Sequence, residues 1–184
     1  MNIVSISGSP SQRSRSGWLL ELAQARLETA AHERHRVQVR ELPAHALVAA
    51  DARHPEVAAS VARVAEADVL IVSTPIYKAA YSGLLKLWLD LLPQDALRGK
   101  TVLPLATGGS IAHLLAVDYA LKPVLSALGA RNILDGVYAT DAQLPSLPAG
   151  GYAPDDALLE RLDRALQPLL STHERMRVAE PARC

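Results

Sequence analysis

Short apolar runs alternate along this chain with longer segments whose apolar residues recur every three or four positions. Two of the runs, ADVLIVSTP and KTVLPLATGG, are apolar almost throughout, which is typical of strands covered on both faces in a parallel sheet. The pattern predicts strands at 2–7, 36–41, 68–74, 101–107 and 132–138, and helices at 17–30, 55–65, 83–91, 111–128 and 155–171. Such alternation indicates right-handed βαβ crossovers, hence one α/β domain over residues 1–173 followed by a C-terminal tail over 174–184. Five strands of this size favour a flavodoxin-like parallel sheet of order 2-1-3-4-5, with helices on both faces.

Composition and charge remove several classes of protein. The chain has 184 residues, with 19 Lys and Arg against 19 Asp and Glu, and this zero net charge argues against a general nucleic-acid binder. No apolar run reaches the roughly 18 residues of a membrane span, and no secretory signal is visible, so a cytoplasmic protein is expected. Cys184 is the single cysteine, which leaves no intrachain disulfide. Neither it nor the six histidines show metal-ligand spacing, so no metal is predicted.

The segment GSPSQRSRSG follows the first predicted strand and leads into a helix. Its hydroxyls at Ser9, Ser14 and Ser16, the charge of Arg15 and the free N–H groups of the helix N-terminus would suit a phosphate monoester. It is not a P-loop, because no Gly-Lys-Ser/Thr follows Gly8 at the required spacing. The alternative is that these serines only cap the helix.

Two further segments are expected at the same edge of the sheet, because ligands of such folds bind outside the carboxyl ends of the strands. In TPIYKAAYSG, Pro75 is expected to end strand pairing and to display Ile76 and Tyr77, against which a flat ring could lie. The alternative is that Tyr77 covers the core. In ATGGS, Gly108 and Gly109 follow Thr107 and would allow positive φ or a close approach of backbone to a ligand, although a plain tight turn uses the same residues. The three segments together predict a binding site for a phosphorylated ligand with a flat ring.

The predicted helix 111–128 has a phase problem. Its apolar stripe, made of Ile111, Leu114, Leu121, Leu125 and Leu128, contains Asp118, and an unpaired carboxylate should not be buried there. Pro123 also removes the N–H that would bond to the Tyr119 carbonyl. One extra residue bulging out near Asp118 and Tyr119 would remove both problems, since a π-bulge shifts the face by one position. A regular helix with Asp118 paired or at an interface is the alternative.

GSPSQRSRSG, TPIYKAAYSGLLKLWLDLLP and LPLATGGSIAHLLAVDYALKPVLSALGA together resemble the NAD(P)H-dependent FMN reductases, and most closely the flavin reductases of two-component alkanesulfonate monooxygenase systems. The resemblance covers roughly residues 1–140 and implies a flavodoxin-like enzyme that reduces FMN with NADPH, with NADH as the alternative donor, and releases the reduced flavin to a partner monooxygenase for sulfur acquisition. It also implies a π-helix at the subunit interface of a homotetramer, or at least a homo-oligomer, with Tyr119 as the inserted residue beside Asp118. By matching positions, Ser9, Ser14, Arg15 and Ser16 would hold the FMN phosphate, Pro75, Ile76 and Tyr77 would flank the isoalloxazine, and Thr107, Gly108 and Gly109 would meet its polar edge.

Hydride transfer from a nicotinamide to a flavin requires stacking of the two rings and needs no acid or base from the protein, so no catalytic residue is predicted. Two other functions stay open. One is a quinone or azo reductase that retains FMN, and the other is a non-catalytic flavodoxin-like electron carrier. The neutral charge and the absence of a Thr-rich phosphate loop argue against the carrier.

Overall fold

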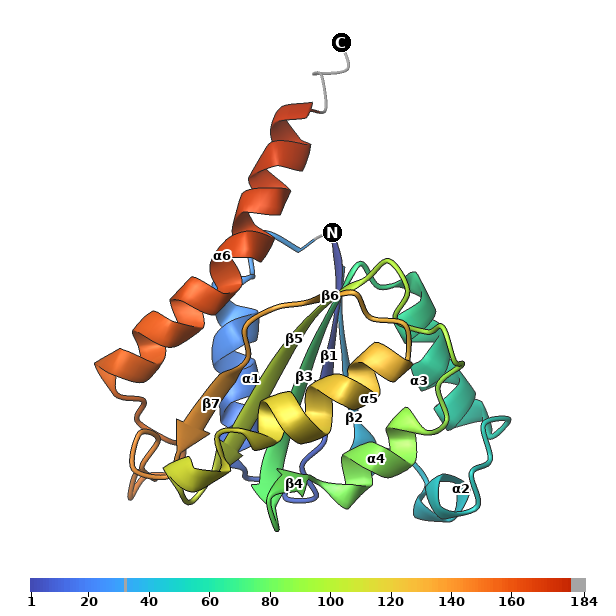
Figure 1. Ribbon diagram of the computed structural model, residues 1–184, viewed down its shortest axis with the longest axis horizontal. Coiled ribbons are helices and arrows are strands. Elements are labelled where there is room, and N and C mark those ends of the chain that lie inside the picture. Colours follow the sequence, from blue (N-terminus) through green and yellow to red (C-terminus); the bar gives the residue numbers. More distant parts are fainter. Residues whose placement is uncertain (32, 180–184) are drawn as a thin grey trace.

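A twisted parallel sheet forms the centre of the molecule, in a computed structural model that describes residues 1–31 and 33–179, with side chains up to residue 171 (Figure 1). The strand order is β2-β1-β3-β5, after which β6 and β7 both pair with β5, and the short β4 pairs with β3 alone. The strands are β1 (Asn2–Ser7), β2 (Glu33–Gln38), β3 (Val69–Tyr77), β4 (Ala80–Tyr81), β5 (Thr101–Gly108), β6 (Asn132–Ile133) and β7 (Val137–Thr140). The predicted flavodoxin-like order is confirmed, with the fifth strand divided in two and one short antiparallel strand added.

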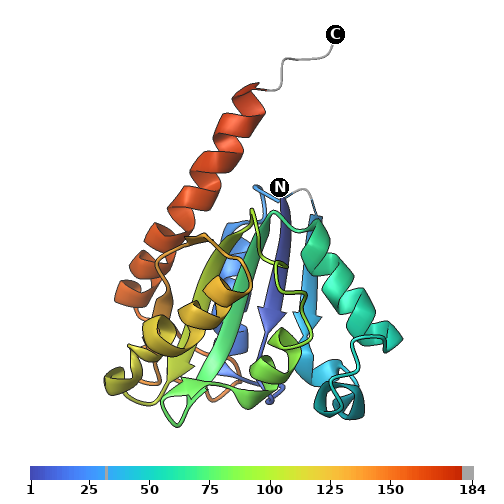
Figure 2. The ribbon, with the colours of Figure 1, turned by 45° about the vertical axis from the view of Figure 1, so that its right-hand side comes forward.

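Helices cover both faces of this sheet (Figures 1 and 2). On one face, α1 (Arg15–Arg26) and α6 (Asp156–Ala179) enclose a core that contains Leu19, Leu20 and Leu162. On the other face, the core around Trp88 and Leu125 lies beneath α3 (Pro55–Glu66), α4 (Gly83–Leu89) and α5 (Lys122–Ala127). The remaining elements are α2 (Ala44–Val48), two 3₁₀ turns at Val39–Glu41 and Ile111–His113, and a π-helix at Val117–Leu121. Within the described residues, no helix is both long and apolar enough to cross a membrane.

Strand β2 begins and ends three residues earlier than the predicted 36–41, so the predicted position of this strand is wrong. In the observed pairing Val37 lies beside Ile6, and the segment Val39–Glu41 turns into a 3₁₀ helix. The polar residues of this edge strand, Glu33 to Arg36, carry no apolar alternation. They are in the sheet because their backbone pairs with β1, which apolar periodicity does not report.

Strand β3 continues through Pro75 to Tyr77, so the predicted end at residue 74 is also wrong. The N–H of Gly8 donates to the Ser73 carbonyl, which shows that Ser73, and therefore Pro75 two residues on, direct their backbone groups toward β1. Strand β1 has already ended at that level, so the missing N–H of proline interrupts no ladder bond. Pairing with β5 persists on the other side, where Pro75 lies opposite Thr107.

Other predicted boundaries change as well, among them helix 17–30, which is observed as α1 at Arg15–Arg26. The predicted strand 132–138 breaks before Gly136, where any Cβ would lie 2.8 Å from Val117 Cγ1, so the chain must pass this point without a side chain. The predicted helix 155–171 continues to Ala179, and the predicted tail 174–184 therefore begins inside α6. Residues 180–184, with Cys184, lie outside the described residues.

The predicted helix 111–128 is not continuous, and its middle part is the predicted π-bulge. The Lys122 N–H donates to the Val117 carbonyl five residues back. This phase buries Val117, Leu121 and Leu125, and it places Asp118 at the surface, where its Oδ1 lies 2.6 Å from Lys122 Nζ. The stripe prediction was wrong for Ile111 and Leu114, because both side chains are exposed.

Candidate functional site

The predicted site residues line one cleft of about 240 Å³ at the carboxyl ends of the central strands. Because β1, β3 and β5 run parallel, the loops that follow them meet at one edge of the sheet. The cleft is lined by every predicted cofactor-binding residue, namely Ser9, Ser14, Arg15, Ser16, Pro75, Ile76, Tyr77, Thr107, Gly108 and Gly109, and also by Ser11, Arg13, Asp141 and Tyr152. The last four were missed by sequence reasoning, Asp141 and Tyr152 because nothing local marks the chain beyond β7 as part of the site.

The serines of the first loop include the helix cap that was the alternative to phosphate binding. Ser14 is the N-cap of α1, since its Oγ accepts a hydrogen bond of 3.0 Å from the Gly17 N–H. A hydroxyl that accepts at a cap still has its own proton to donate. Ser16 Oγ lies 3.5 Å from Ser14 Oγ, and Ser9 Oγ accepts from the Ser11 N–H at 3.1 Å. The loop therefore places several serine hydroxyls together at the N-terminus of a 12-residue helix, where the free backbone N–H groups favour an anion.

A buried serine that sequence reasoning missed fastens this loop to its neighbours. Ser82 Oγ donates to the Gly8 carbonyl at 2.5 Å and accepts from the Leu85 N–H at 3.1 Å as the N-cap of α4. The Ser82 N–H donates to Thr74 Oγ1 at 3.0 Å. A Cβ on Gly8 would lie 2.7 Å from Leu85 Cβ, so glycine is needed for the loop to approach α4 this closely. The only sequence signal was a serine directly before a helix.

Arg15 lines the cleft, but its guanidinium is engaged with the chain that follows β7. Its Nε donates to the Leu144 carbonyl at 2.9 Å, and its Nη1 lies 3.4 Å from Asp141 Oδ2. Its Cζ also lies 5.3 Å from the centre of the Tyr152 ring. Arg15 thus ties the start of α1 to the 141–152 segment, while the exposed Arg13 faces the same cleft with no such tie among the described residues.

The second segment forms a β-hairpin at the end of β3. Ile76 and Tyr77 pair with Tyr81 and Ala80 across a two-residue turn, in which Lys78 and Ala79 have φ values of 49° and 62°. Two non-glycine residues in this left-handed region are strained, and such strain concentrates at functional sites. The Ile76 side chain is buried, whereas that of Tyr77 is 50% exposed, so Tyr77 does not cover the core.

The third segment depends on close packing rather than on positive φ. Neither Gly108 nor Gly109 has a left-handed φ, but a Cβ on Gly108 would lie 2.5 Å from Tyr138 Oη. That hydroxyl donates to the Ser110 carbonyl at 2.6 Å and so fixes the loop that follows β5. Burial raises the pKa of Tyr138, and the nearby charge of Asp141 raises it further, so the phenol keeps its proton and remains a donor.

Comparison with known proteins gives matches along most of the chain. The sequence profile of the family described as NADPH-dependent FMN reductase matches residues 1–144. An "FMN reductase (NADPH)" of Pseudomonas putida is 54% identical over 170 residues, which cover 91% of this chain and 85% of the relative. The "NADH-dependent FMN reductase SfnE" of Pseudomonas putida is 35% identical over 181 residues, with 96% of each chain covered. The apo crystal structure of an "NADH:FMN oxidoreductase (EMOB)" superposes with a TM-score of 0.82 at 40% identity, covering 91% of this chain and 87% of that one.

Proposed function

The chain belongs to the NADPH-dependent FMN reductase family, and we propose that it binds FMN in the cleft at the ends of β1, β3 and β5, reduces it with NADPH and releases the reduced flavin to a partner monooxygenase. The observation that carries this proposal is the convergence of ten residues, from three segments distant in sequence, on one cleft. The 54% identity to a relative named for NADPH favours that nicotinamide over NADH.

The residues present fit FMN at both ends. Ser14 and Ser16 hydroxyls, the N-terminus of α1 and the Arg13 guanidinium suit a phosphate of roughly −1.5 to −2 charges. At the other end, Gly108 and Gly109 line the cleft without side chains, so that a flat ring would meet the backbone there. Tyr77 provides an exposed aromatic face at the rim.

When bound, the flavin supplies the hydride acceptor and the nicotinamide the donor. The protein's own part is to bind and orient. The Ser82 and Tyr138 hydrogen bonds hold the first and third loops in place, and Thr107 to Gly109 present backbone to the polar edge of the ring. No side chain of the cleft is given a proton-transfer role.

Release of reduced flavin to a monooxygenase, in alkanesulfonate desulfonation, is the finer part of the proposal. The open cleft and the half-exposed Tyr77 support an exchangeable flavin. We also propose that the protein is a homo-oligomer, a dimer or a tetramer, that buries Tyr119. In the single chain this residue is 78% exposed, and Ile111, Leu114 and Leu115 beside it are exposed as well. Ile111 follows two residues after Gly109, which lines the flavin cleft.

The first test is the flavin requirement of the purified full-length protein. We expect NADPH oxidation only when FMN is added. A preparation that stays yellow through purification and reduces quinones without added flavin would instead indicate an FMN-retaining reductase.

The second test concerns the phosphate loop. Changing Ser9 and Ser16 together to alanine should weaken FMN binding by about a hundredfold or more, since each of the two lost hydrogen bonds to a charged group contributes roughly 1.5–3 kcal/mol. Riboflavin, which lacks the phosphate, is the matched control and should bind nearly as before. Equal weakening of both flavins in a fluorescence titration would remove the phosphate assignment.

The oligomer is tested by light scattering on the intact chain. Tyr119→Ser should shift the assembly toward a smaller species if Tyr119 lies at the interface, while the exposed Tyr77→Ser serves as the control. A wild-type protein that is monomeric at all concentrations contradicts the oligomer without affecting the flavin assignment.

A further inference from the structure

A second and larger cavity, of about 590 Å³, lies beside the flavin cleft on the α1 face of the sheet. Its walls are α1, the carboxyl half of β2 and the hairpin 146–152, and we call it the α1–β2 pocket. It shares Ser11, Arg13, Ser14 and Tyr152 with the flavin cleft, so the two are continuous. Its volume is within the range of about 300–1,000 Å³ that is usual for small-molecule sites.

The hairpin 146–152 is held by backbone hydrogen bonds and packs against α1. Ser146 pairs with Tyr152, and the Leu147 N–H donates to the Gly151 carbonyl at 3.0 Å. Gly151 has a φ of 83°, and a Cβ there would lie 3.1 Å from the Trp18 ring. Glycine is therefore needed both for the turn and for packing the hairpin onto α1. The sequence marked this segment only as a loop before the last helix.

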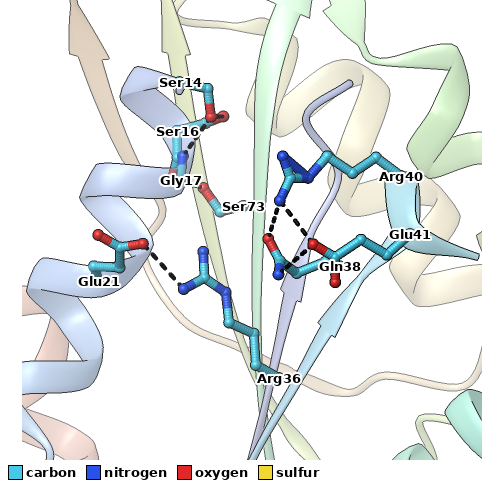
Figure 3. Close-up of polar contacts among 9 residues, drawn as sticks. All are labelled: Ser14, Ser16, Gly17, Glu21, Arg36, Gln38, Arg40, Glu41 and Ser73. Atoms are coloured by element: carbon cyan, nitrogen blue, oxygen red, sulfur yellow. Dashed lines mark hydrogen bonds and ion pairs between the residues drawn. The ribbon is translucent and has the colours of Figure 1, made fainter. Parts of the chain in front are cut away.

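One side of the pocket is cationic. Arg36 extends from β2 toward α1, and its Nη1 lies 3.0 Å from Glu21 Oε1 (Figure 3). Arg13 lines the pocket from the loop after β1. Among the residues that the structure describes, the buried Nε of Arg36 and Nε1 of Trp18 have no hydrogen-bond partner. Buried donors without partners are rare in native proteins, and both belong to side chains that line this pocket.

The other side of the pocket is apolar and aromatic. Leu147 lines it with a side chain that is 45% exposed, next to Pro148, and Tyr152 stands between the pocket and the flavin cleft. The Trp18 and Tyr152 rings contact each other edge to face, with centroids 6.1 Å apart. A ligand that fits both sides carries phosphate at one end and a flat apolar ring at the other.

From these features we propose that the α1–β2 pocket binds the phosphorylated adenosine end of the nicotinamide dinucleotide, with Arg36 contacting the 2′-phosphate that distinguishes NADPH from NADH. This rests on the proposed function, because a dinucleotide whose nicotinamide lies on the flavin needs a continuous second cavity for its other end. An arginine commonly accommodates the 2′-phosphate of NADP in dinucleotide-binding folds. The carboxylate of Glu21 holds Arg36 in the absence of a ligand and competes with the phosphate for it.

Steady-state kinetics with both nicotinamides tests the proposal. Arg36→Gln should raise the KM for NADPH by about tenfold to a hundredfold and leave that for NADH nearly unchanged. Arg34→Gln is the matched control, because it removes the same charge from the same strand, where Arg34 pairs with Glu28 and does not line the pocket. It should leave the ratio of the two KM values unchanged.

Two further measurements test the pocket assignment independently of the Arg36→Gln kinetics. Should Arg36→Gln fail to fold, Glu21→Gln should lower the KM for NADPH several-fold, because the competing carboxylate is gone. In calorimetry, adenosine 2′,5′-bisphosphate should bind the wild-type protein more tightly than adenosine 5′-monophosphate does, and Arg36→Gln should remove the difference.

Failure of this inference differs from failure of the proposed function. The pocket assignment is overturned, and the reductase function stands, if FMN is reduced but the ratio of the KM values for NADPH and NADH is the same in wild type, Arg36→Gln and Glu21→Gln. The same conclusion follows if Arg36→Gln still binds adenosine 2′,5′-bisphosphate more tightly than adenosine 5′-monophosphate. If neither nicotinamide reduces FMN, the proposed function fails, and the pocket assignment falls with it.

Discussion

Adding one methyl group at Gly108 should destabilise the protein far more than adding it at the neighbouring Gly109. A Cβ on Gly108 would lie 2.5 Å from Tyr138 Oη and 3.3 Å from Tyr138 Cζ, both well inside van der Waals contact. On Gly109 the nearest atom would be Asp141 Oδ2 at 3.9 Å, which is ordinary contact. In Gly108→Ala the tyrosine ring must therefore move, and its 2.6 Å hydrogen bond to the Ser110 carbonyl must lengthen or break.

The cost has two parts. Overpacking a well-filled core costs about 1–3 kcal/mol, and loss of a buried hydrogen bond adds about 1 kcal/mol. A loss of about 2–4 kcal/mol corresponds to a drop in Tm of roughly 4–16 °C for a domain of this size. Gly109→Ala should stay within about 0.5 kcal/mol of wild type.

Thermal unfolding of four variants checks this reasoning: Gly108→Ala, Gly109→Ala, Tyr138→Phe and the double variant of positions 108 and 138. Tyr138→Phe removes the atom that the methyl group would meet, so Gly108→Ala combined with Tyr138→Phe should be less destabilised than the sum of the two single changes. Equal Tm values for Gly108→Ala and Gly109→Ala, or strict additivity in the double variant, would refute the packing account. FMN affinity of the folded Gly108→Ala protein should fall as well, since the residue lines the cleft.

Three other changes test the supports of the site. Ser82→Ala should lower the free energy of unfolding in urea by about 1–3 kcal/mol, because it removes an N-cap and leaves the Gly8 carbonyl without its donor. Ser110→Ala removes a cap at an exposed residue and should lower it by less than about 1 kcal/mol. Tyr77→Ala should leave Tm nearly unchanged and weaken FMN by about threefold to tenfold, and a collapse of Tm with intact flavin affinity would contradict its place at the rim. Because burial raises the pKa of Tyr138 above 10.0, the folded state holds this proton more tightly than the unfolded state, so the free energy of unfolding should fall as pH rises above that value. The fall should be smaller in Tyr138→Phe, and identical Tm curves against pH for the two proteins would show that Tyr138 does not contribute.

The sequence by itself determined the fold class, the strand order and the three segments that line the cleft at the ends of β1, β3 and β5. Continuous apolar runs such as those of β3 and β5 report burial on both faces, and parallel strands bring the ends of distant runs to one edge without any further information. Asp118 inside an apolar stripe left two alternatives open, a π-bulge or a regular helix with Asp118 paired, and the family resemblance favoured the bulge that the structure contains.

Only the tertiary structure decided which partner each of these residues meets. Strand β3 continues through Pro75 because β1 has ended at that level, and β2 is in the sheet because its backbone pairs with β1 although its residues are polar. The need for glycine at position 108 comes from Tyr138, thirty residues away in the chain, and the α1–β2 pocket depends on a hairpin folded back from beyond β7. Apolar periodicity records whether a side chain leaves water, whereas contacts between distant segments depend on distances that arise only when the whole chain has packed.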